Sequence, residues 1–451
     1  MRYITMNIWL SRLATLGVVL TLVRPAFAQT MDGSSGLGLV SESGVTVIDG
    51  NAYATITLLP EIRIGKVGVG LYVPLMFSMK DGSFRGTPYE GGYSPLRVVR
   101  YLSYGTKKQD PFYVRLGDLT GTSLGFGFIV YNYTNATNFE TTTIGVDLDV
   151  RTARGIGLEA MYSNVEEPAV IGLRPYVRPL ELLGMNVPIV DRLEVGALYV
   201  TDRSDVATGV ADPITAIGLD AGIPVPLGRL ATVTPYVAWA SIADVDRGPF
   251  RLEGGMGAGI GTSLALRGPA GLFFLNAKIE RRFFSDHFVG SLFDGLYESS
   301  KIIGGDRLPI ERLQRASAEQ ATAGSLVGSV LGKVEIGGTL IMPDAASTGG
   351  ERNPGSYLNL YATAPDAIPM VYADATYHRA DIQDGSDVFK LDERSLASAG
   401  LGYRVGSALV IGTRYNWTFS VHPDTEELEV VSYITPFVQL SMSRNIQSSV
   451  R

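Results

Sequence analysis

The side chains that could carry out catalysis are few in this chain, and their spacing does not suit it. The sequence contains three histidines, His287, His378 and His422, and no cysteine. Ser285-Asp286-His287 are neighbours in the chain, and neighbours seldom reach the hydrogen-bond distance that a nucleophile and its base require. Asp374 and His378 lie on one face of an expected strand, about 13 Å apart at roughly 3.3 Å per residue. We therefore expect no enzyme, and no thiolate metal site.

Two further patterns resemble ligand sites in composition alone. Residues 381–387 place carboxylates around Gly385, as calcium loops do, but they lack the bidentate Glu at the twelfth position and the oxygen spacing of such loops. The glycines of Gly125-Phe126-Gly127 lie in an expected strand that continues to residue 131, whereas a phosphate cradle requires a turn from strand to helix. The sequence therefore predicts a solvated acidic turn in the first case, and no metal or cofactor in either.

The remaining polar chemistry is a set of charged residues on alternate positions of expected strands. Charges of both signs on the inner wall of a water-filled channel set its transverse field and its ionic preference. In a closed lumen the same charges would pair with one another, which is the simpler interpretation for any single residue. For the set as a whole we favour an aqueous lumen, and the candidate lumen-facing residues are Arg115, Asp147, Asp149, Arg151, Glu194, Lys278, Glu280, Asp374, Arg404 and Arg414.

These charges belong to segments that alternate with the period of two typical of β-strands. In residues 144–151, branched apolar residues alternate with a glycine, two aspartates and an arginine. After a turn at residues 153–155 the chain returns through a second alternating segment, 156–162, so the pair is an expected antiparallel hairpin. The same alternation recurs in residues 53–64, 67–75, 126–131, 273–280, 409–417 and 430–444.

The first 28 residues predict export from the cytoplasm. Arg2 and Arg12 precede an apolar run over residues 13–23, and the segment closes on Ala26-Phe27-Ala28. A positive start, a short apolar run and a small-x-small ending are typical of a cleaved signal peptide. The run is too short to span a bilayer, which takes about 20 apolar residues.

The composition of the rest favours a membrane barrel over other classes. Charged residues make up 18% of the chain, below the roughly 25% of a typical soluble protein. No later segment offers the 18 or so consecutive apolar residues of a membrane helix, so a helical membrane protein is excluded. Hydrophobicity spread over a chain with 53 glycines and 22 tyrosines suits a transmembrane β-barrel. The net charge of −7 argues against nucleic acid as a partner.

The expected fold is all-β, a transmembrane antiparallel barrel of roughly 16–18 strands with short periplasmic turns and long outer loops. A periplasmic or surface β-sandwich or solenoid is the alternative. We divide the chain into a signal peptide (1–28), a flexible segment or short plug (29–51) and the barrel (52–451). The long polar segments are 80–109, 201–212, 285–323, 343–356 and 381–393. Residues 94–102 and 310–321 have helical character, as surface helices or as constrictions folded into the lumen.

The segment from Val45 to about Arg203 resembles a known family. It contains VTVIDGNAYATITLLPEIRIGKVGVGLYVPL, YGTKKQDPFYVRLGDLTGTSLGFGFIVYNYTN, IGLEAMYSNV and LRPYVRPL. These stretches resemble uncharacterised outer-membrane β-barrel proteins of Bacteroidetes-like and related bacteria. The shared features are turn glycines, an Arg-x-Gly strand and a Leu-Gly-x-Gly strand, so the resemblance implies a porin-like outer-membrane barrel and supplies no substrate. The chain departs from the common pattern by ending on Val450-Arg451 and not on an aromatic residue.

The function expected from these features is a porin-like channel for passive diffusion of small hydrophilic solutes, because barrels of about 16–18 strands leave an aqueous passage. A substrate-specific or hydrophobic-molecule transporter plugged by residues 29–51 is one alternative. A structural barrel that docks a partner through its long loops is another. The expected location is the bacterial outer membrane. The expected partners are outer-membrane lipid, the barrel-assembly machinery and small solutes, with the oligomeric state left open.

Overall fold

The computed structural model describes residues 36–445, apart from 49–50, 87–97, 136–142, 186, 205–212, 248–249, 270–271, 296, 299–300, 302–308, 345–355, 393–394, 407–408 and 422–427. The expected signal peptide therefore lies outside the described residues. Within the described part, no helix is long and apolar enough to cross a membrane.

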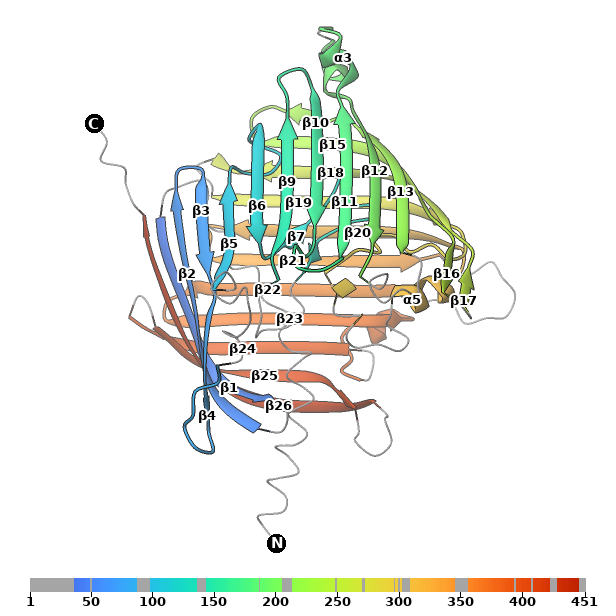
Figure 1. Cartoon of the computed structure of the whole chain (residues 1–451). Helices are drawn as coiled ribbons and strands as arrows, with labels where there is room; N and C mark the ends of the chain where they lie inside the picture. The colour runs from blue at the N-terminus through green and yellow to red at the C-terminus, as the bar shows by residue number, and fades with distance from the viewer. Residues whose placement is uncertain are drawn as a thin grey trace, which may run out of the picture.

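The chain forms one closed antiparallel barrel of twenty strands (Figure 1). Two of these strands are interrupted: β3 and β4 lie end to end against β2, and β13 and β14 lie end to end against β15. The barrel closes where β26 pairs with β1. The wall segments are β1 (Gly36–Ile48), β2 (Asn51–Ile64), β3 (Val67–Leu71), β4 (Val73–Ser78), β5 (Val99–Tyr104), β6 (Phe112–Gly117), β9 (Gly145–Arg151), β10 (Ile156–Tyr162), β11 (Val170–Val177), β12 (Glu194–Asp202), β13 (Ile214–Gly222), β14 (Val225–Leu227), β15 (Ala231–Ile242), β18 (Met256–Arg267), β19 (Phe273–Phe284), β20 (Glu319–Val330), β21 (Val334–Pro343), β22 (Ser356–Ile368), β23 (Val371–Ile382), β24 (Ser395–Val405), β25 (Leu409–Val421) and β26 (Leu428–Asn445).

Short elements lie in the connections between the wall strands. Two small strands, β7 (Thr120–Thr122) and β8 (Tyr133–Thr134), pair with each other, and β16 (Val245–Arg247) pairs with β17 (Phe250–Leu252). The helical turns are α3 (Pro179–Leu182), η4 (Val190–Arg192), α5 (Pro309–Arg315) and η8 (Gly385–Asp387).

The wall strands follow the alternation of their residues. On β9, Asp147 and Asp149 are each 2% exposed, whereas the apolar residues that alternate with them, Val146, Leu148 and Val150, are only half-buried. The expected hairpin is confirmed by the pairing of β9 with β10. On β3, Gly70 lies on the buried face, and a Cβ there would come within 2.5 Å of the Tyr101 ring. The buried face is the inside of the barrel, so polar residues and glycines point inward.

The opposite face of the wall is apolar and exposed. Large apolar side chains recur at the outward positions of successive strands: Ile217 and Leu219 on β13, Val237 and Trp239 on β15, Ile260, Ile279, Leu401 and Ile411. A barrel that pairs all its strands and presents such a surface satisfies the requirements of hydrocarbon, which offers no hydrogen bonds to an open sheet edge.

The connections differ in length between the two ends of the barrel. Turns of a few residues join the strands at the end where β1 begins and β26 finishes, which we name the short-turn end; α3 and η4 lie in its longest connection, residues 178–193. The other end, the long-loop end, carries the connections 79–98, 118–144, 163–169, 203–213, 243–255, 285–318, 344–355, 383–394 and 422–427. The expected asymmetry between short turns and long loops is therefore confirmed.

Four expectations from the sequence need correction. The barrel has twenty strands, more than the 16–18 expected. One of the extra strands is β1, whose residues 36–48 were expected to be a flexible segment or plug. Its glycines and serines lower the local strand signal, but its backbone pairs with both β2 and β26. Residues 310–321 form a shorter helix, α5, because β20 already begins at Glu319.

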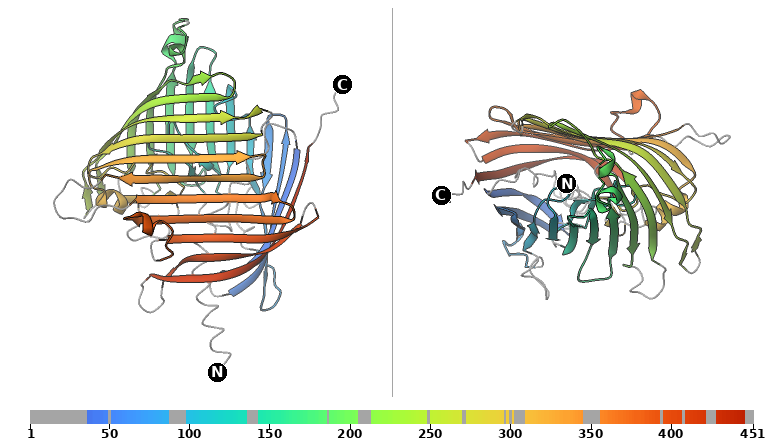
Figure 2. Two further views of the ribbon diagram at one scale, coloured as in Figure 1. Left: turned by 180° about the vertical axis from the view of Figure 1, so that it is seen from behind. Right: turned by 90° about the horizontal axis from the view of Figure 1, so that it is seen from above.

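The fourth correction concerns residues 126–131, which lie in turns and bends and not in the expected strand. They belong to the connection between β6 and β9. That connection folds back inside the ring of strands, where Figure 2 shows the chain between the walls. Alternation there reflects packing on two sides of an internal segment, which a period of two cannot distinguish from a strand.

Candidate functional site

Two segments from the long-loop end fold into the barrel and occupy part of its interior. We name residues 118–135 the first inner segment and residues 285–298 the second inner segment. Their backbones join each other inside the barrel, where the amide of Phe293 donates to Ile129 O and the amide of Tyr131 donates to Phe293 O, both at 3.1 Å. The candidate site is the part of the barrel interior that these two segments do not fill.

The first inner segment is pinned to the wall by a buried asparagine. Asn135 accepts a hydrogen bond from the amide of Leu119 through Oδ1 at 2.8 Å. Its Nδ2 donates to Ser163 O at 2.8 Å and to Thr143 O at 3.2 Å. One side chain thus joins both ends of the segment to the adjacent wall, so the fold-back is part of the packed structure.

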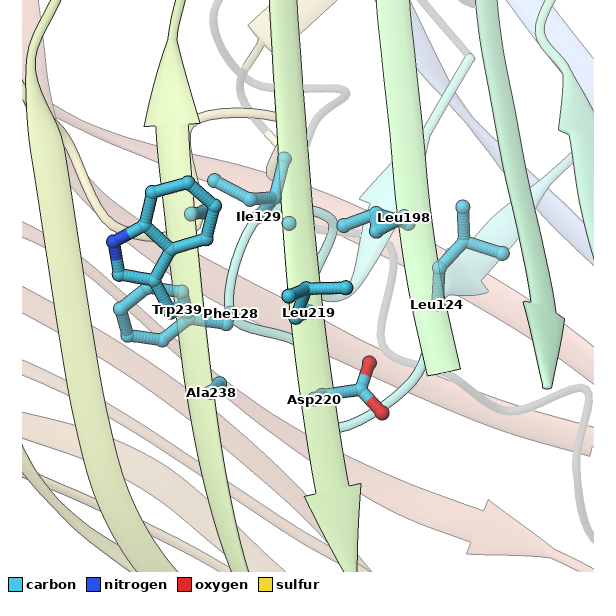
Figure 3. A pocket seen from close by; sticks show the side chains of 10 residues that line it. Leu124, Phe128, Ile129, Leu198, Leu219, Asp220, Ala238 and Trp239 are labelled. Carbon is cyan, nitrogen blue, oxygen red and sulfur yellow. The ribbon is translucent and has the colours of Figure 1, made fainter. Parts of the chain in front are cut away.

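An apolar cluster joins the inner segments to one side of the wall. From the inner segments it contains Leu119, Leu124, Phe128, Ile129, Val130, Tyr133, Phe288, Leu292, Phe293 and Tyr297, and Leu313 of α5 joins them. Burying each large apolar side chain contributes about 1.5–3 kcal/mol relative to leaving it in water. Figure 3 shows Leu124, Phe128 and Ile129 beside the strands that carry Leu198, Asp220 and Ala238.

The cluster is confined to one part of the circumference. Its wall members come from β10 to β15 and from the β16–β17 hairpin: Met161, Val170, Leu198, Val200, Ile214, Ala216, Ala238, Ala240, Ile242, Val245 and Leu252. Among the residues that the structure describes, β20–β26 and β1–β5 contribute no member. The apolar filling is therefore eccentric.

On the short-turn side of the cluster lies a group of buried charges centred on Arg174 of β11. The guanidinium is fully buried and donates from Nη1 to Glu159 at 2.9 Å and to Glu194 at 3.0 Å, and from Nε to Asp220 at 2.8 Å. Gly196 leaves the space for it, because a Cβ there would lie 2.5 Å from Nε of Arg174. A buried charge costs free energy unless it is paired, so one guanidinium and its carboxylates must be kept together.

Two lysines from the β5–β6 connection reach the same region from the short-turn end. Lys107 lies 2.7 Å from Asp147 and also donates to Ser123 O of the first inner segment at 3.0 Å. Lys108 pairs with Glu159, and its amide donates to Asp149 at 2.9 Å. The β5–β6 connection thereby holds the first inner segment from the short-turn end.

The second inner segment is held by a hydrogen-bonded group at the long-loop end. The Tyr297 hydroxyl donates to Asp202 at 2.7 Å, Lys301 lies 2.8 Å from Asp202, and the Tyr133 hydroxyl donates to Glu298. Burial, together with the neighbouring carboxylates, raises the pKa of Tyr133 and of Tyr297 well above the ordinary phenol range. Both phenols therefore stay protonated and remain donors at any physiological pH.

The side of the lumen without the apolar cluster carries arginines around a tyrosine. Arg115 stacks over the Tyr101 ring at 3.9 Å, and Arg100 lies 5.1 Å from the same ring. Arg100 pairs with Glu61 at 3.1 Å, and a bulge in β5 turns Arg100 towards that inward carboxylate. Arg63 of β2 lies in the same region, because a Cβ built on Gly68 would come within 3.7 Å of its Nη2 and within 3.6 Å of the Tyr101 ring. Further around the wall, Arg414 pairs with Asp374 at 2.9 Å and Arg404 donates to Pro365 O at 2.6 Å.

The ten candidate residues are thus spread over several groups. The structure pairs two couples from the set, Lys278 with Glu280 at 3.3 Å and Asp374 with Arg414. Glu280 also accepts from Tyr236 and Arg282, each at 2.6 Å. The other candidates contact residues outside the set: Asp147, Asp149 and Glu194 contact Lys107, Lys108 and Arg174, and Arg115 donates to Asp118 O. Arg151 has its backbone bonded to Pro111 O.

Several residues of the site have no place among the sequence candidates. Glu159, Arg174 and Asp220 occupy alternate positions of expected or observed strands, so the alternation alone could identify them. Lys107 and Lys108 lie in a connection, where no periodicity signals which way a side chain points. Their role follows from the tertiary structure alone.

Several of the residues weighed for catalysis are held by hydrogen bonds or an ion pair. Ser285 Oγ donates to Asp286 O at 3.0 Å and accepts from the amide of Met256, while His287 Nδ1 lies 3.2 Å from Leu313 O. Asp374 is paired with Arg414, and His422 lies outside the described residues. In the described part of the chain, no group of three or more His, Asp or Glu side chains is placed to hold a metal ion.

Comparisons with known proteins give structural neighbours and no sequence relatives. No protein-family model matches the sequence, and no curated protein matches it. The chain is similar to OccAB2 from Acinetobacter baumannii, with 11% identity, a TM-score of 0.36, and coverage of 91% of this chain and 98% of that one. It is similar to the outer membrane protein OpdK from Pseudomonas aeruginosa, with 10% identity, a TM-score of 0.34, and coverage of 91% and 99%.

A third neighbour is a ferric enterobactin receptor from Pseudomonas aeruginosa, with 11% identity, a TM-score of 0.37, and coverage of 91% of this chain and 81% of that one. At these identities the likeness concerns the fold alone. The strand pairing of the chain itself therefore establishes what it is: a closed antiparallel β-barrel of twenty strands, with an apolar outer wall and a partly filled, charged interior.

Proposed function

We propose that this barrel is an outer-membrane channel for passive diffusion of small hydrophilic solutes. The observation that carries the proposal is the eccentric filling of the interior, which keeps the apolar cluster away from β20–β26 and β1–β5. A barrel of more than about 16 strands is wide enough for an aqueous passage. We place that passage along the inner face of these strands, beside the inner segments.

The candidate inward residues divide between this passage and the filled side. Arg404, Arg414 and Asp374 lie along the proposed passage, together with Arg63 and Arg100, and Arg115 of β6 borders it through its stacking on Tyr101. The other candidates, Asp147, Asp149, Arg151, Glu194, Lys278 and Glu280, lie on the strands that face the inner segments. Because guanidiniums outnumber carboxylates around Tyr101, the field in the passage favours anions over cations.

Reconstitution of the refolded barrel in planar bilayers tests the proposal. We expect discrete conductance steps from protein whose heat-modifiable gel mobility shows that it is folded. Folded protein that never conducts would contradict the channel. Replacing residues 121–132 by a short Gly/Ser linker should then widen the passage and raise the conductance.

The same deletion separates the channel from its main alternative, a transporter whose lumen is closed. The buried packing of the inner segments favours that alternative, since a firmly held filling suits a plug as well as a constriction. A closed transporter conducts only after the deletion, whereas the channel conducts before it.

Charge preference is a separate prediction for the Tyr101 group. Replacing Arg63 and Arg115 by Gln removes two inward cations, so the permeability ratio of chloride to potassium should fall several-fold. The measurement is the reversal potential under a KCl gradient. The matched control is Arg281→Gln, which removes an arginine that pairs with Asp344 on the outer side of β19. Equal ratios in the two variants would show that the passage does not run past Tyr101.

A further inference from the structure

The connection between β23 and β24 folds back over the outer surface of the barrel. Asp374 pairs inside the lumen with Arg414, so the odd positions Tyr377 and Arg379 of the same strand point outward. Both contact residues 383–392 of the connection, which we name the outer lobe. Figure 2, in its view from above, shows this orange-red connection outside the ring of strands.

A buried arginine clamps the lobe to the wall. Arg379 is fully buried, and its Nη2 lies 2.9 Å from Asp387 and 3.0 Å from Asp392. Its Nη1 donates to Lys390 O at 3.2 Å. A guanidinium on an outward, apolar wall is expensive unless its donors are satisfied, so Arg379 and the lobe require each other.

The neighbouring aromatic residues complete the clamp. The Tyr377 hydroxyl lies 2.8 Å from Val388 O and 2.9 Å from Lys390 O, so its single proton is shared between these two carbonyls. Trp417 of β25 donates from Nε1 to Asp392 O at 3.4 Å. Within the lobe, Asp384 accepts from the amide of Ser386 at 2.8 Å and starts the turn η8. The lobe is therefore a rigid part of the outer wall, spanning β23 to β25.

The surface that this clamp presents is apolar with one cation. Phe389 is 73% exposed and Leu391 is 43% exposed, although both follow a tightly bonded turn. Between them Lys390 keeps its ammonium 3.2 Å from Asp387 with half of its side chain exposed. Aromatic and aliphatic side chains next to a lysine are typical of the boundary between acyl chains and headgroups.

The height of the lobe agrees with that boundary. Arg379 lies eight residues beyond Val371, at the start of β23, and this corresponds to about 26 Å along a strand. With the usual tilt of about 35–45° the rise along the barrel axis is about 20 Å, close to the roughly 25 Å height of the apolar band of such barrels. The lobe thus lies where the outer wall leaves the hydrocarbon.

We propose that the outer lobe is a lipid-interface anchor, which inserts Phe389 and Leu391 among the outermost acyl segments and directs Lys390 towards lipid phosphate. A second copy of the chain fits less well. Two exposed apolar side chains offer far less than the about 800 Å² per partner of a stable protein interface. The lobe also lies on the outer side of β23–β25, where exposed side chains such as Leu401 and Ile411 are apolar.

Site-directed spin labelling tests this directly, because the chain has no cysteine. A nitroxide is attached to Phe389→Cys, and to Ser386→Cys as the matched control on the exposed start of the lobe. Each barrel is refolded in phosphatidylcholine vesicles, and the accessibility of the label to oxygen and to a water-soluble nickel chelate is measured. We expect oxygen to dominate at position 389 and the nickel chelate to dominate at position 386.

Two results would overturn the proposal. Equal nickel accessibility at both positions would place the lobe in water. A label at position 389 that neither reagent reaches would place it in a protein interface, and the occupant would be another copy.

The clamp is tested with Tyr377→Phe in the Phe389→Cys background, which removes the hydroxyl that two carbonyls share and keeps the wall apolar. We expect the ratio of oxygen to nickel accessibility at position 389 to fall several-fold and the spectral lines to narrow as the label gains motion. An unchanged ratio would show that the clamp does not position the anchor. Arg379→Gln is the stronger variant if it still gives the heat-modifiable barrel.

Discussion

At the scale of single residues, the interior is governed by a few charges that each hold several partners. Arg174 joins β10, β11, β12 and β13 through Glu159, Glu194 and Asp220. Removing Arg174 takes a shared cation from three carboxylates, and among the described residues only Glu159 and Glu194 keep another cation, Lys108 and Arg178 respectively.

We expect Arg174→Leu to lower the free energy of unfolding by about 3–5 kcal/mol, because three carboxylates lose their shared cation. Urea titration of the barrel in lipid vesicles measures this change. The matched control is Arg154→Gln in the exposed turn between β9 and β10, which should change stability by less than about 0.5 kcal/mol. Similar losses in both variants would contradict the assignment of Arg174 as the centre of the group.

The two faces of β9 provide a second test. Leu148→Arg should cost about 2–4 kcal/mol, because it places a charge on the lipid face near mid-height. Alternation alone predicts that Asp149→Arg, on the other face, is tolerated. The structure changes this expectation, since Asp149 accepts the amide of Lys108 and the Tyr176 hydroxyl.

We therefore expect Asp149→Arg to be destabilising as well, by about 1–3 kcal/mol, and Asp149→Asn, which keeps an acceptor, to cost less. Folding titrations of the three variants decide the matter. A tolerated Leu148→Arg would mean that the register of β9 is shifted by one residue.

At the scale of elements, the sequence predicts the strands of the wall better than it predicts the segments in the interior. The strand β9 and its hairpin partner are predictable because a period of two, with aspartate on one face, has one interpretation in a sheet with an apolar side. The strand β1 is not, because residues 36–48 are rich in glycine and serine and gain their order from β2 and β26. Residues 126–131 satisfy the local rule and still form no strand, since their partners, Phe288 and Phe293, are distant in the chain.

Phe293 is the residue through which the two inner segments can be loosened. It is fully buried, so Phe293→Ala leaves a cavity between the segments and removes about 3–5 kcal/mol of local packing. We expect the variance of the open-channel current to increase, because the segments then move within the lumen. Phe389→Ala on the outer lobe is the control, and equal variance in both variants would contradict an inner segment that borders the passage.

At the scale of the whole molecule, the closing contact of the barrel lies between its first and last strands. β1 pairs with β26 over residues 36–43 and with β2 over its full length. Residues 36–48 are therefore wall, and the expectation that they plug the lumen is wrong. What the sequence does predict at this scale is the all-β closed fold, because hydrophobicity is spread over alternating positions throughout the chain.

Deleting residues 36–48 distinguishes wall from plug. A plug deletion would raise the conductance of an intact barrel. We expect instead the loss of the heat-modifiable folded form, since β2 and β26 are left as unpaired edges in hydrocarbon. Deleting residues 179–182, the exposed turn α3, should leave the folded form unchanged and serves as the control. A folded, more conductive barrel after the first deletion would refute the closure.

The meeting of the two inner segments also imposes an order on assembly. Tyr133 and Glu298 are 165 residues apart, and every strand from β9 to β19 lies between them in the chain. Closing so long a loop is unfavourable until the intervening strands are already in place. We therefore expect the contact between the two inner segments to form only after strands β9 to β19 have assembled, so that this part of the lumen narrows late.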